Sequence, residues 1–212
     1  MKLFDYRKSY DKDELRIQDV GKNPIDFFIK WFKEAEENSK IVEPNAMTIS
    51  TVDENNTPSS RVVLLKQVKS RSLIFFTNYK SNKGKSLEMN KNICASFYWA
   101  PLERQVIIKG LADKISEIDS QNYFSSRPFE SQVAAIISNQ SEPISSYENL
   151  LEEYDSFIDK NQTTKLKKPK NWGGIEITIS QIEFWQGRKN RLHNRIQCVF
   201  NKDLWEYKIL SP

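Results

Sequence analysis

The chain has 212 residues, of which 38% are hydrophobic and 12% aromatic, so it can bury the core of one domain and is not a disordered chain. Its 32 basic and 28 acidic residues leave a net charge of +4, which is well short of a nucleic-acid-binding composition and suits local sites for small anions. A single histidine excludes a multi-histidine site within one chain and disfavours a zinc site, so we expect no bound metal.

The N-terminal sequence and the cysteines indicate the compartment. No stretch approaches the roughly 18 apolar residues of a membrane span, and charges run through residues 1–15, so we expect neither a membrane segment nor a secretory signal. Cys94 and Cys198 lie far apart, and neither belongs to a CxxC pair. A disulfide stays open, but two free thiols in a reducing compartment are the simpler interpretation, and we expect a cytoplasmic protein.

The first half of the chain begins with an arm and a helix and then changes to strands. Residues 1–20 are polar and mixed in charge, which predicts an N-terminal arm. Residues 24–38 place aromatic residues at helical spacing after Pro24, which suits a first helical turn. A short helix is expected at 81–92. Segments rich in β-branched and aromatic residues predict strands at 46–53, 60–68, 72–78, 93–100 and 104–115, the last two joined by a turn at Pro101.

The second half contains two helical stretches and three more strands. The helical patterns cover 117–138, broken at Pro128, and 145–160, and a basic loop follows at 163–172. The last strands are expected at 175–186, 191–200 and 204–210. About eight strands with short connections predict a mainly β fold with peripheral helices, a small and mostly antiparallel barrel. Without a repeat or linker, we expect one domain over residues 21–212.

The sharpest local signal lies in the predicted C-terminal strand. If residues 191–195 are extended, Arg191, His193 and Arg195 point to one face over about 13 Å, at roughly 3.3 Å per residue. Three potential cations on one face suit a bound anion, because the arginine fork matches phosphate. A solvated edge strand protected by its charge is the alternative.

Two further cationic patterns occur earlier in the chain. Lysines in the first helical turn at 81–85 oppose the helix dipole unless a phosphate binds there, although a solvated surface turn has the same pattern. Arg61 and Lys66 bracket four apolar residues on a predicted strand, where they face opposite sides and need not share a ligand. A core strand with charged ends is the alternative. The spacing matches neither a P-loop nor a dinucleotide-binding GxGxxG motif.

Tyr123 and Arg127 are four residues apart on a predicted helix and are therefore neighbours on its surface. A plain surface contact explains that spacing equally well. If His193 serves elsewhere, no histidine remains for a Ser-His-Asp arrangement. The residues alone thus indicate a small β-rich barrel suited to phosphorylated ligands, without a reaction.

Seven segments in order resemble the pyridoxine/pyridoxamine 5′-phosphate oxidase family. The resemblance runs from about residue 5 to the end of the chain, and FWQG followed by RLHNR is its most specific part. It implies a homodimeric FMN-binding split barrel with FMN at the subunit interface. The segments are RVVLLK (61–66), FFTNYKSNKGK (75–85), PLERQV (101–106), YFSSRPFESQ (123–132), SNQS (138–141), WGGIEI (172–177) and IEFWQGRKNRLHNR (182–195).

The resemblance also implies the site residues. The implied FMN contacts are Arg61, Val62, Val63, Leu64, Leu65, Lys66, Phe76, Thr77, Asn82, Lys83, Gln105, Gln140, Ser141, Trp185 and Arg195. The implied substrate contacts are Lys66, Tyr123, Arg127, Ser131, Arg191 and His193.

The implied reaction is oxidation of pyridoxamine or pyridoxine 5′-phosphate to pyridoxal 5′-phosphate, with hydride passing from substrate C4′ to the flavin, oxygen as acceptor and hydrogen peroxide as product. Protein side chains accept hydride poorly, so a cofactor must do so. Arg191 and His193 are implied as the catalytic pair that orients the substrate. A histidine between two arginines is biased toward the neutral form.

Two positions and one segment depart from the family pattern. Asn82 replaces a usual arginine, which predicts the loss of one flavin phosphate contact. Asn194 replaces a common aspartate, and 131–138 lacks the usual glycine and tryptophan.

Three other functions stay open at this point. The same barrel serves flavin reductases, which would not need Tyr123, Arg127, Ser131, Arg191 and His193 together. A non-catalytic flavin or pyridoxal-phosphate carrier is also open, whereas an RNA-binding barrel is disfavoured by the near balance of charges.

Overall fold

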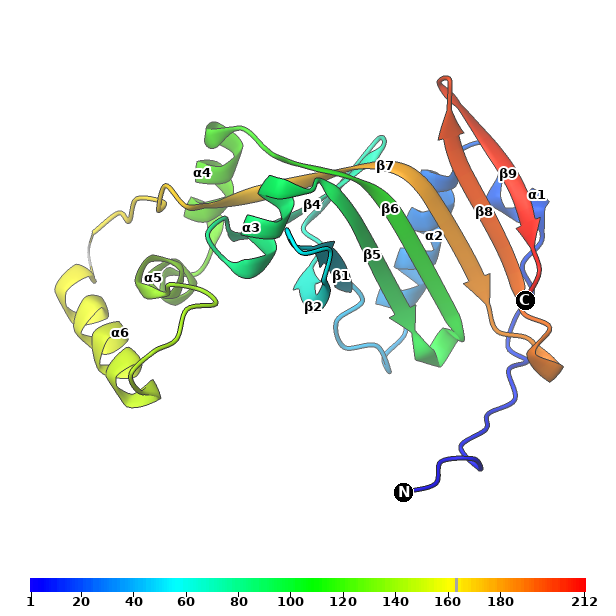
Figure 1. Cartoon of the computed structure of the whole chain (residues 1–212), viewed down its shortest axis with the longest axis horizontal. Coiled ribbons are helices and arrows are strands. Elements are labelled where there is room, and N and C mark those ends of the chain that lie inside the picture. Colours follow the sequence, from blue (N-terminus) through cyan, green and yellow to red (C-terminus); the bar gives the residue numbers. More distant parts are fainter. Residues whose placement is uncertain (163) are drawn as a thin grey trace.

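A curled antiparallel sheet forms the centre of the structure, a computed structural model that describes residues 1–162 and 164–212 (Figure 1). Within these residues the sheet has nine strands, and every pairing between them is antiparallel. The strands are β1 (Ala46–Val52), β2 (Pro58–Leu64), β3 (Gln67–Lys69), β4 (Ser72–Asn78), β5 (Asn92–Trp99), β6 (Arg104–Lys114), β7 (Trp172–Gln186), β8 (Asn194–Asn201) and β9 (Leu204–Leu210).

The long strand β7 divides the sheet into two parts. The main strand order is β2-β1-β5-β6-β7-β4-β3, and the β8–β9 hairpin is attached to β7 outside this order. On one side β7 pairs with β6 from Ile175 to Gln186. On its other side residues 172–178 pair with β4, whereas residues 181–186 pair with β8. The sheet is therefore split between β4 and β8, and β7 is the one continuous strand that joins the part with β4 to the part with β8.

An irregularity in the β6–β7 ladder lies where β7 changes partner. The register shifts between Lys109 and Gly110, and Ser180 of β7 is left out of the pairing. A Cβ atom on Gly110 would lie 2.1 Å from the Thr178 carbonyl oxygen. Only glycine allows this close approach, and such bulges bend the strand that carries them.

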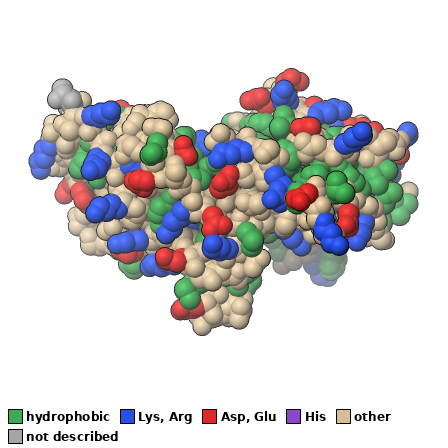
Figure 2. Space-filling model, turned by 90° about the horizontal axis from the view of Figure 1, so that it is seen from above, with side chains coloured by type: hydrophobic (Ala, Val, Ile, Leu, Met, Phe, Trp, Pro, Cys, Tyr) green, Lys and Arg blue, Asp and Glu red, His purple; other side chains and the backbone are tan. Residues whose placement is uncertain are grey.

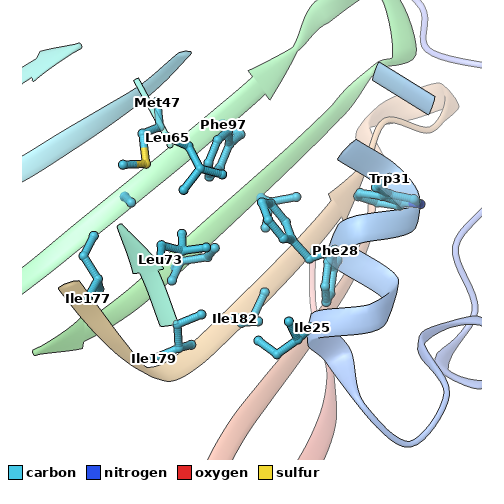
Figure 3. Packing of buried hydrophobic residues seen from close by; sticks show 14 of the residues in the cluster. Ile25, Phe28, Trp31, Met47, Leu65, Leu73, Phe97, Ile177, Ile179 and Ile182 are labelled. Atoms are coloured by element: carbon cyan, nitrogen blue, oxygen red, sulfur yellow. The ribbon is translucent and has the colours of Figure 1, made fainter. Parts of the chain in front are cut away.

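Helix α2 covers one face of the sheet and supplies much of the core. Its N-terminus is capped by Asn23, whose side chain accepts a hydrogen bond from the Ile25 N–H, with Pro24 in the first turn. Phe28 packs against Phe97 of β5 with ring centres 5.3 Å apart, and Trp31 meets Phe184 of β7 edge-on at 5.4 Å. Figure 3 shows Phe28 and Trp31 on α2 beside the strand residues of the core. The helices are α1 (Ile17–Val20), α2 (Pro24–Glu36), α3 (Asn82–Met89), α4 (Glu117–Ser126), α5 (Phe129–Ile137) and α6 (Tyr147–Asn161), with 3₁₀ turns η1 (Ala100–Leu102) and η2 (Lys189–Arg191).

Helices α3 to α6 gather at the end of the molecule where β7 begins (Figure 1). A second, smaller apolar cluster forms there around Phe124, Val133, Leu166 and Trp172. The opposite end carries the β8–β9 hairpin, α1 and the 3₁₀ turn η2 (Figure 1).

The N-terminal arm runs along the β8 end of the molecule and is held there by polar contacts. The backbone N–H groups of Asp11 and Lys12 donate to Glu103 Oε2 at 2.9 and 3.2 Å, and Lys8 Nζ lies 3.1 Å from Glu103 Oε1. Further along the arm, Leu15 is buried in the main core.

The predicted mainly β, antiparallel fold is confirmed, with two local corrections. The predicted strand 60–68 is two strands, because the chain leaves the ladder at Leu65 and Lys66. The predicted strand 191–200 begins only at Asn194, because Arg191 has a left-handed φ of 63° that ends a 3₁₀ turn. The predicted basic loop 163–172 begins at residue 163, which lies outside the described residues; 164–171 form no helix or strand.

The surface mixes charges of both signs. On the face shown in Figure 2, lysine and arginine are interspersed with aspartate and glutamate. In the described part of the chain, no helix combines the length and apolarity needed to cross a membrane.

Candidate active site

A cavity of about 820 Å³ lies between β2, β4 and the helices α3 to α5. Fourteen of the residues implied as FMN or substrate contacts line it. They are Arg61, Val62, Val63, Leu64, Lys66, Phe76, Thr77, Asn82, Lys83, Tyr123, Arg127, Ser131, Gln140 and Ser141.

Four cationic side chains line this cavity. They are Arg61, Lys66, Lys83 and Arg127, and no aspartate or glutamate is among the described residues that line it. Arg61 and Lys66, expected on opposite sides of one strand, both line the cavity, and Lys66 lies beyond the end of β2 at Leu64. Such a wall of one sign attracts anions and favours a ligand with phosphate groups.

Lys83 lies in the first turn of α3, beside the capping residue. Ser81 Oγ accepts hydrogen bonds from the Gly84 N–H at 3.4 Å and from Lys83 Nζ at 3.2 Å. Burial, with the charge of Arg61 as a smaller cause, lowers the pKa of Lys83 to about 8. A cation in the first turn also opposes the helix dipole. An anion bound at this point would offset the cost of burying the charge of Lys83 and the unfavourable interaction with the dipole.

Aromatic rings line the opposite wall. The Phe76 and Tyr123 rings stack with centroids 3.7 Å apart, and the Trp172 ring is parallel to Tyr123 at 6.2 Å. The guanidinium carbon of Arg127 lies 4.8 Å from the centre of the Trp172 ring. Arg127 Nη1 is buried and has no hydrogen-bond partner within residues 1–162 and 164–212. Since a buried N–H group without a partner is costly, this atom marks a place for an acceptor such as a phosphate oxygen.

Loop residues after α5 close one side of the cavity. Thr77 Oγ1 donates to Gln140 Oε1 at 3.3 Å, which ties this loop to β4. Ser141 has a left-handed φ of 75°. Leu65, in contrast, is buried in the main core and does not line the cavity.

The other implied residues form a second group at the far end of β7, which we call the C-terminal group: Gln105, Trp185, Arg191, His193 and Arg195. Gln105, Trp185 and Arg195 are direct partners across β6, β7 and β8, so they share one face of the sheet. Arg195 Nε donates to Glu183 Oε1 at 2.8 Å, and its Nη1 donates to the Ser211 carbonyl at 2.9 Å.

His193 packs between aromatic rings in this group. Its ring centre lies 4.7 Å from Trp185 and 5.7 Å from Tyr10 of the N-terminal arm. His193 Nδ1 accepts a hydrogen bond from the Arg188 N–H at 3.0 Å. Burial and the nearby charge of Arg191 lower the pKa of His193. The shared strand face expected for Arg191, His193 and Arg195 is wrong, since only Arg195 belongs to β8.

The cavity and the C-terminal group are far apart within one chain. Trp172 of the cavity and Trp185 of the C-terminal group are thirteen residues apart on β7. At roughly 3.3 Å per residue this is up to about 43 Å along the strand, shortened by the bend at Ser180. Because α3 to α5 beside the cavity and the β8–β9 hairpin lie at opposite ends of the molecule (Figure 1), one small ligand cannot contact both groups of a single chain.

The sequence matches two family models over most of its length. The model described as pyridoxamine 5′-phosphate oxidase matches residues 33–186, and that of the pyridoxine 5′-phosphate oxidase C-terminal dimerisation region matches residues 172–212. The chain belongs to the pyridoxamine 5′-phosphate oxidase family. The resemblance inferred from the seven segments is thereby confirmed.

Full-length relatives carry the same description. The pyridoxine/pyridoxamine 5′-phosphate oxidase of Flavobacterium johnsoniae is 48% identical over 99% of this chain and 98% of its own. That of Leptospira interrogans serovar Lai is 44% identical over 100% of this chain and 99% of its own.

Solved structures confirm the predicted split-barrel fold. PhzG from Burkholderia lata, in complex with tetrahydrophenazine-1-carboxylic acid, superposes with a TM-score of 0.88 at 22% identity, covering 95% of this chain and all of its own. A pyridoxamine 5′-phosphate oxidase-related, FMN-binding protein from Nostoc punctiforme has a TM-score of 0.73 at 14% identity, covering 89% and 98% of the two chains.

Sequence reasoning missed several cavity residues of this family member. Trp172 was noted only as the start of a matching segment, and its role in the cavity depends on ring contacts with α4 that no local pattern encodes. The others are small or uncharged and give no signal of their own: Asn78, Pro128, Ala134, Ala135 and Ser138.

Proposed function

We propose that the protein is an FMN-dependent oxidase that converts pyridoxamine or pyridoxine 5′-phosphate to pyridoxal 5′-phosphate, with oxygen as acceptor and hydrogen peroxide as product. The observation that carries this proposal is a cavity with four cations, no described acidic residue and an unpaired buried Arg127 Nη1. Relatives at 44–48% identity over the full chain support the same reaction.

FMN fits the part of the cavity around α3. Lys83 and Arg61 would hold its phosphate at the helix N-terminus, where burial and the charge of Arg61 lower the pKa of Lys83. Asn82, which also lines the cavity at the start of α3, offers an uncharged amide to the phosphate. The chemistry that FMN supplies when bound is acceptance of a hydride from substrate C4′ and transfer of the electrons to oxygen.

The substrate phosphate fits the part of the cavity around α4 and α5. Arg127 and Lys66 supply charge, and Tyr123 and Ser131 supply hydroxyl groups. The phosphate would accept the hydrogen bond that Arg127 Nη1 lacks in the described part of the protein. These contacts fix the substrate by its phosphate, which is attached through C5′ to the ring carbon next to the one that bears C4′, and so help to orient the reacting carbon.

We further propose that the C-terminal group of a second subunit completes each cavity in a homodimer. Trp172 and Trp185 lie near opposite ends of β7, up to about 43 Å apart along the strand. This separation supports the arrangement, because the C-terminal group cannot reach the cavity of its own chain. The match of residues 172–212 to a dimerisation region supports it as well.

In this arrangement Arg191 and His193 orient the substrate. A neutral His193 that accepts the Arg188 N–H at Nδ1 carries its own proton on Nε2. It would therefore donate a hydrogen bond from Nε2 rather than take a proton there. Two free cysteines, Cys94 and Cys198, fit the proposed cytoplasmic location.

The visible spectrum of the purified protein, followed without oxygen as pyridoxamine 5′-phosphate is added, tests this function. We expect flavin bands that bleach on addition and return with air. Bound flavin that does not bleach would support a flavin reductase or a carrier instead. No flavin binding after reconstitution with FMN would overturn the proposal.

A further inference from the structure

Trp172, the first residue of β7, lies at the centre of the aromatic wall of the cavity. Its ring is parallel to Tyr123 and lies 5.5 Å from Phe76 with an interplanar angle of 18°. Phe124 meets it edge-on at 5.4 Å. Only 7% of the residue is exposed, so the indole is held on several sides at once.

Arg127 depends on this indole for its position. It is the residue that follows α4, and its guanidinium lies over the Trp172 ring. Attraction to the ring face holds the cation while its N–H groups stay available to an acceptor. Within the described residues, Arg127 Nη1 has no such acceptor, so Trp172 supplies the contact that orients this side chain.

A buried lysine fixes the backbone under Trp172. Lys168 Nζ donates to the Trp172 carbonyl at 2.7 Å and to the Pro169 carbonyl at 3.0 Å, and it lies 2.9 Å from Glu117 Oε1. The side chain of Lys168 is 0% exposed, so these three contacts account for the three donors of the ammonium group. Glu117 begins α4, the helix that carries Tyr123 and leads to Arg127.

We propose that Trp172, anchored by Lys168, is a positioning residue that gives the site its preference for phosphorylated substrates. It acts through Tyr123 and Arg127, whose place at the substrate phosphate rests on the function proposed above. Loss of the indole leaves Arg127 free to turn away from the cavity, whereas Lys83, assigned to the FMN phosphate, keeps its contact with Ser81 at the start of α3.

The test compares two substrates in the FMN-loaded protein, pyridoxamine 5′-phosphate and pyridoxamine without the phosphate. In Trp172→Leu we expect kcat/KM for the phosphorylated substrate to fall about tenfold or more, mainly through KM. The value for the unphosphorylated substrate should stay within about twofold. Trp172→Phe keeps a ring face that attracts cations less strongly, so its loss should be intermediate.

Trp205→Leu is the matched control, because it removes a half-buried indole that packs on Phe200 in the β8–β9 hairpin. It should leave the ratio between the two substrates unchanged. An equal loss for both substrates in Trp172→Leu would mean that the indole only stabilises the fold, and the proposal would be overturned.

Binding of pyridoxal 5′-phosphate, measured by equilibrium dialysis, provides a readout that needs no turnover. We expect Trp172→Leu to bind it about tenfold more weakly than the wild type. Equal binding would overturn the role of Trp172. A wild type that binds the compound but oxidises neither substrate would instead count against the proposed reaction.

Discussion

At the scale of single residues, the cavity holds its charges at a cost to the ligand-free protein. Lys83 lies in a helical turn that disfavours cations, and burial and the charge of Arg61 lower its pKa. Arg127 likewise keeps a buried N–H group without a described partner. A bound anion would offset the burial of the Lys83 charge and pair with the Arg127 N–H group. The cavity is thus preorganised for phosphate groups.

The lowered pKa of Lys83 predicts that FMN affinity depends on pH. Without ligand Lys83 loses its proton above about pH 8, and a bound phosphate raises that pKa, so binding becomes linked to proton uptake. The Kd for FMN should therefore rise between about pH 7 and about pH 9.5, approaching tenfold per unit above about pH 8. Fluorescence quenching of FMN measures it.

The matched variants for this experiment are Lys83→Met and Lys66→Met. Lys83→Met should bind FMN weakly with little pH dependence, whereas Lys66→Met should keep the dependence of the wild type. A wild-type Kd that is constant over the same range would contradict the assignment of Lys83 to the phosphate.

Gly84 sets how closely α3 approaches the loop before it. A Cβ atom at this position would lie 2.1 Å from the Tyr79 carbonyl oxygen, so Gly84→Ala must move the first turn of α3. We expect a loss of about 1–3 kcal/mol in the free energy of unfolding, together with weaker FMN binding. Urea denaturation and FMN titration check the two effects.

Lys85→Ala, at the exposed neighbouring position, is the control and should change the free energy of unfolding little. Tight FMN binding by Gly84→Ala would show that the close approach of α3 to Tyr79 is dispensable.

At the scale of elements, one buried carboxylate makes several of the contacts that hold the N-terminal arm. Glu103 is 1% exposed and receives the Asp11 and Lys12 N–H groups and Lys8. Burial acts to raise its pKa, but the hydrogen bonds from Lys8, Lys12 and Asp11 outweigh it, and the pKa lies below its ordinary value. The attachment of the arm is thus present above the usual pKa of a glutamate and is lost only in acid.

Glu103→Gln is expected to loosen the arm. The amide carries one acceptor oxygen and cannot pair with Lys8, so the arm should become a faster substrate for trypsin at Arg7, Lys8 and Lys12. Fragment mass spectrometry over time measures the rate, and Glu14→Gln, in an exposed ion pair with Arg16, is the control. Equal cleavage rates in wild type and Glu103→Gln would argue against this anchor.

The elements also show how far sequence patterns reach. Helical spacing of aromatic residues located α2, and runs rich in β-branched and aromatic residues located eight of the strands, because these residues pack into the core. The strand prediction was wrong at residues 191–193, where the chain turns with a left-handed φ at Arg191. It was also wrong at Leu65–Lys66, which lie between β2 and β3 and belong to neither strand. Fourteen implied site residues meet in one cavity, yet no pattern places Trp172 with them, because its partners come from α4.

At the scale of the whole molecule, the cavity and the C-terminal group lie at opposite ends of the chain's fold and would form one site only between two subunits (Figure 1). The proposed homodimer brings the cavity of one subunit to the C-terminal group of the other. The roles assigned within each half can be separated by mutation, and their pairing can be tested by mixing subunits.

Within the C-terminal group, Arg191 and Arg195 should have opposite effects. Arg191→Ala is expected to lower turnover by roughly a hundredfold while FMN stays bound, because Arg191 is assigned to the substrate. Arg195→Ala should weaken FMN retention, and it also breaks the contacts to Glu183 and the Ser211 carbonyl. Steady-state rates and flavin content after gel filtration separate the two; loss of flavin in Arg191→Ala would reverse its assignment.

Mixed dimers test whether the two halves combine between subunits. Arg127→Ala and Arg195→Ala impair different halves, so a dimer with one of each has one site with both changes and one with neither. After unfolding and refolding an equal mixture, about a quarter of all sites should work. No activity above that of the separate variants would contradict a shared site.

The continuity of β7 has a consequence for how the chain can vary in length. Loops between the helices tolerate added residues, but one residue inserted between Ile179 and Gln181 would exchange the faces of every following side chain. Trp185 would turn toward the core and Phe184 toward solvent, while Trp172 stayed in place. The length of β7 thus fixes the spacing between the cavity and the C-terminal group. We expect insertions that preserve function in the loops and not in β7.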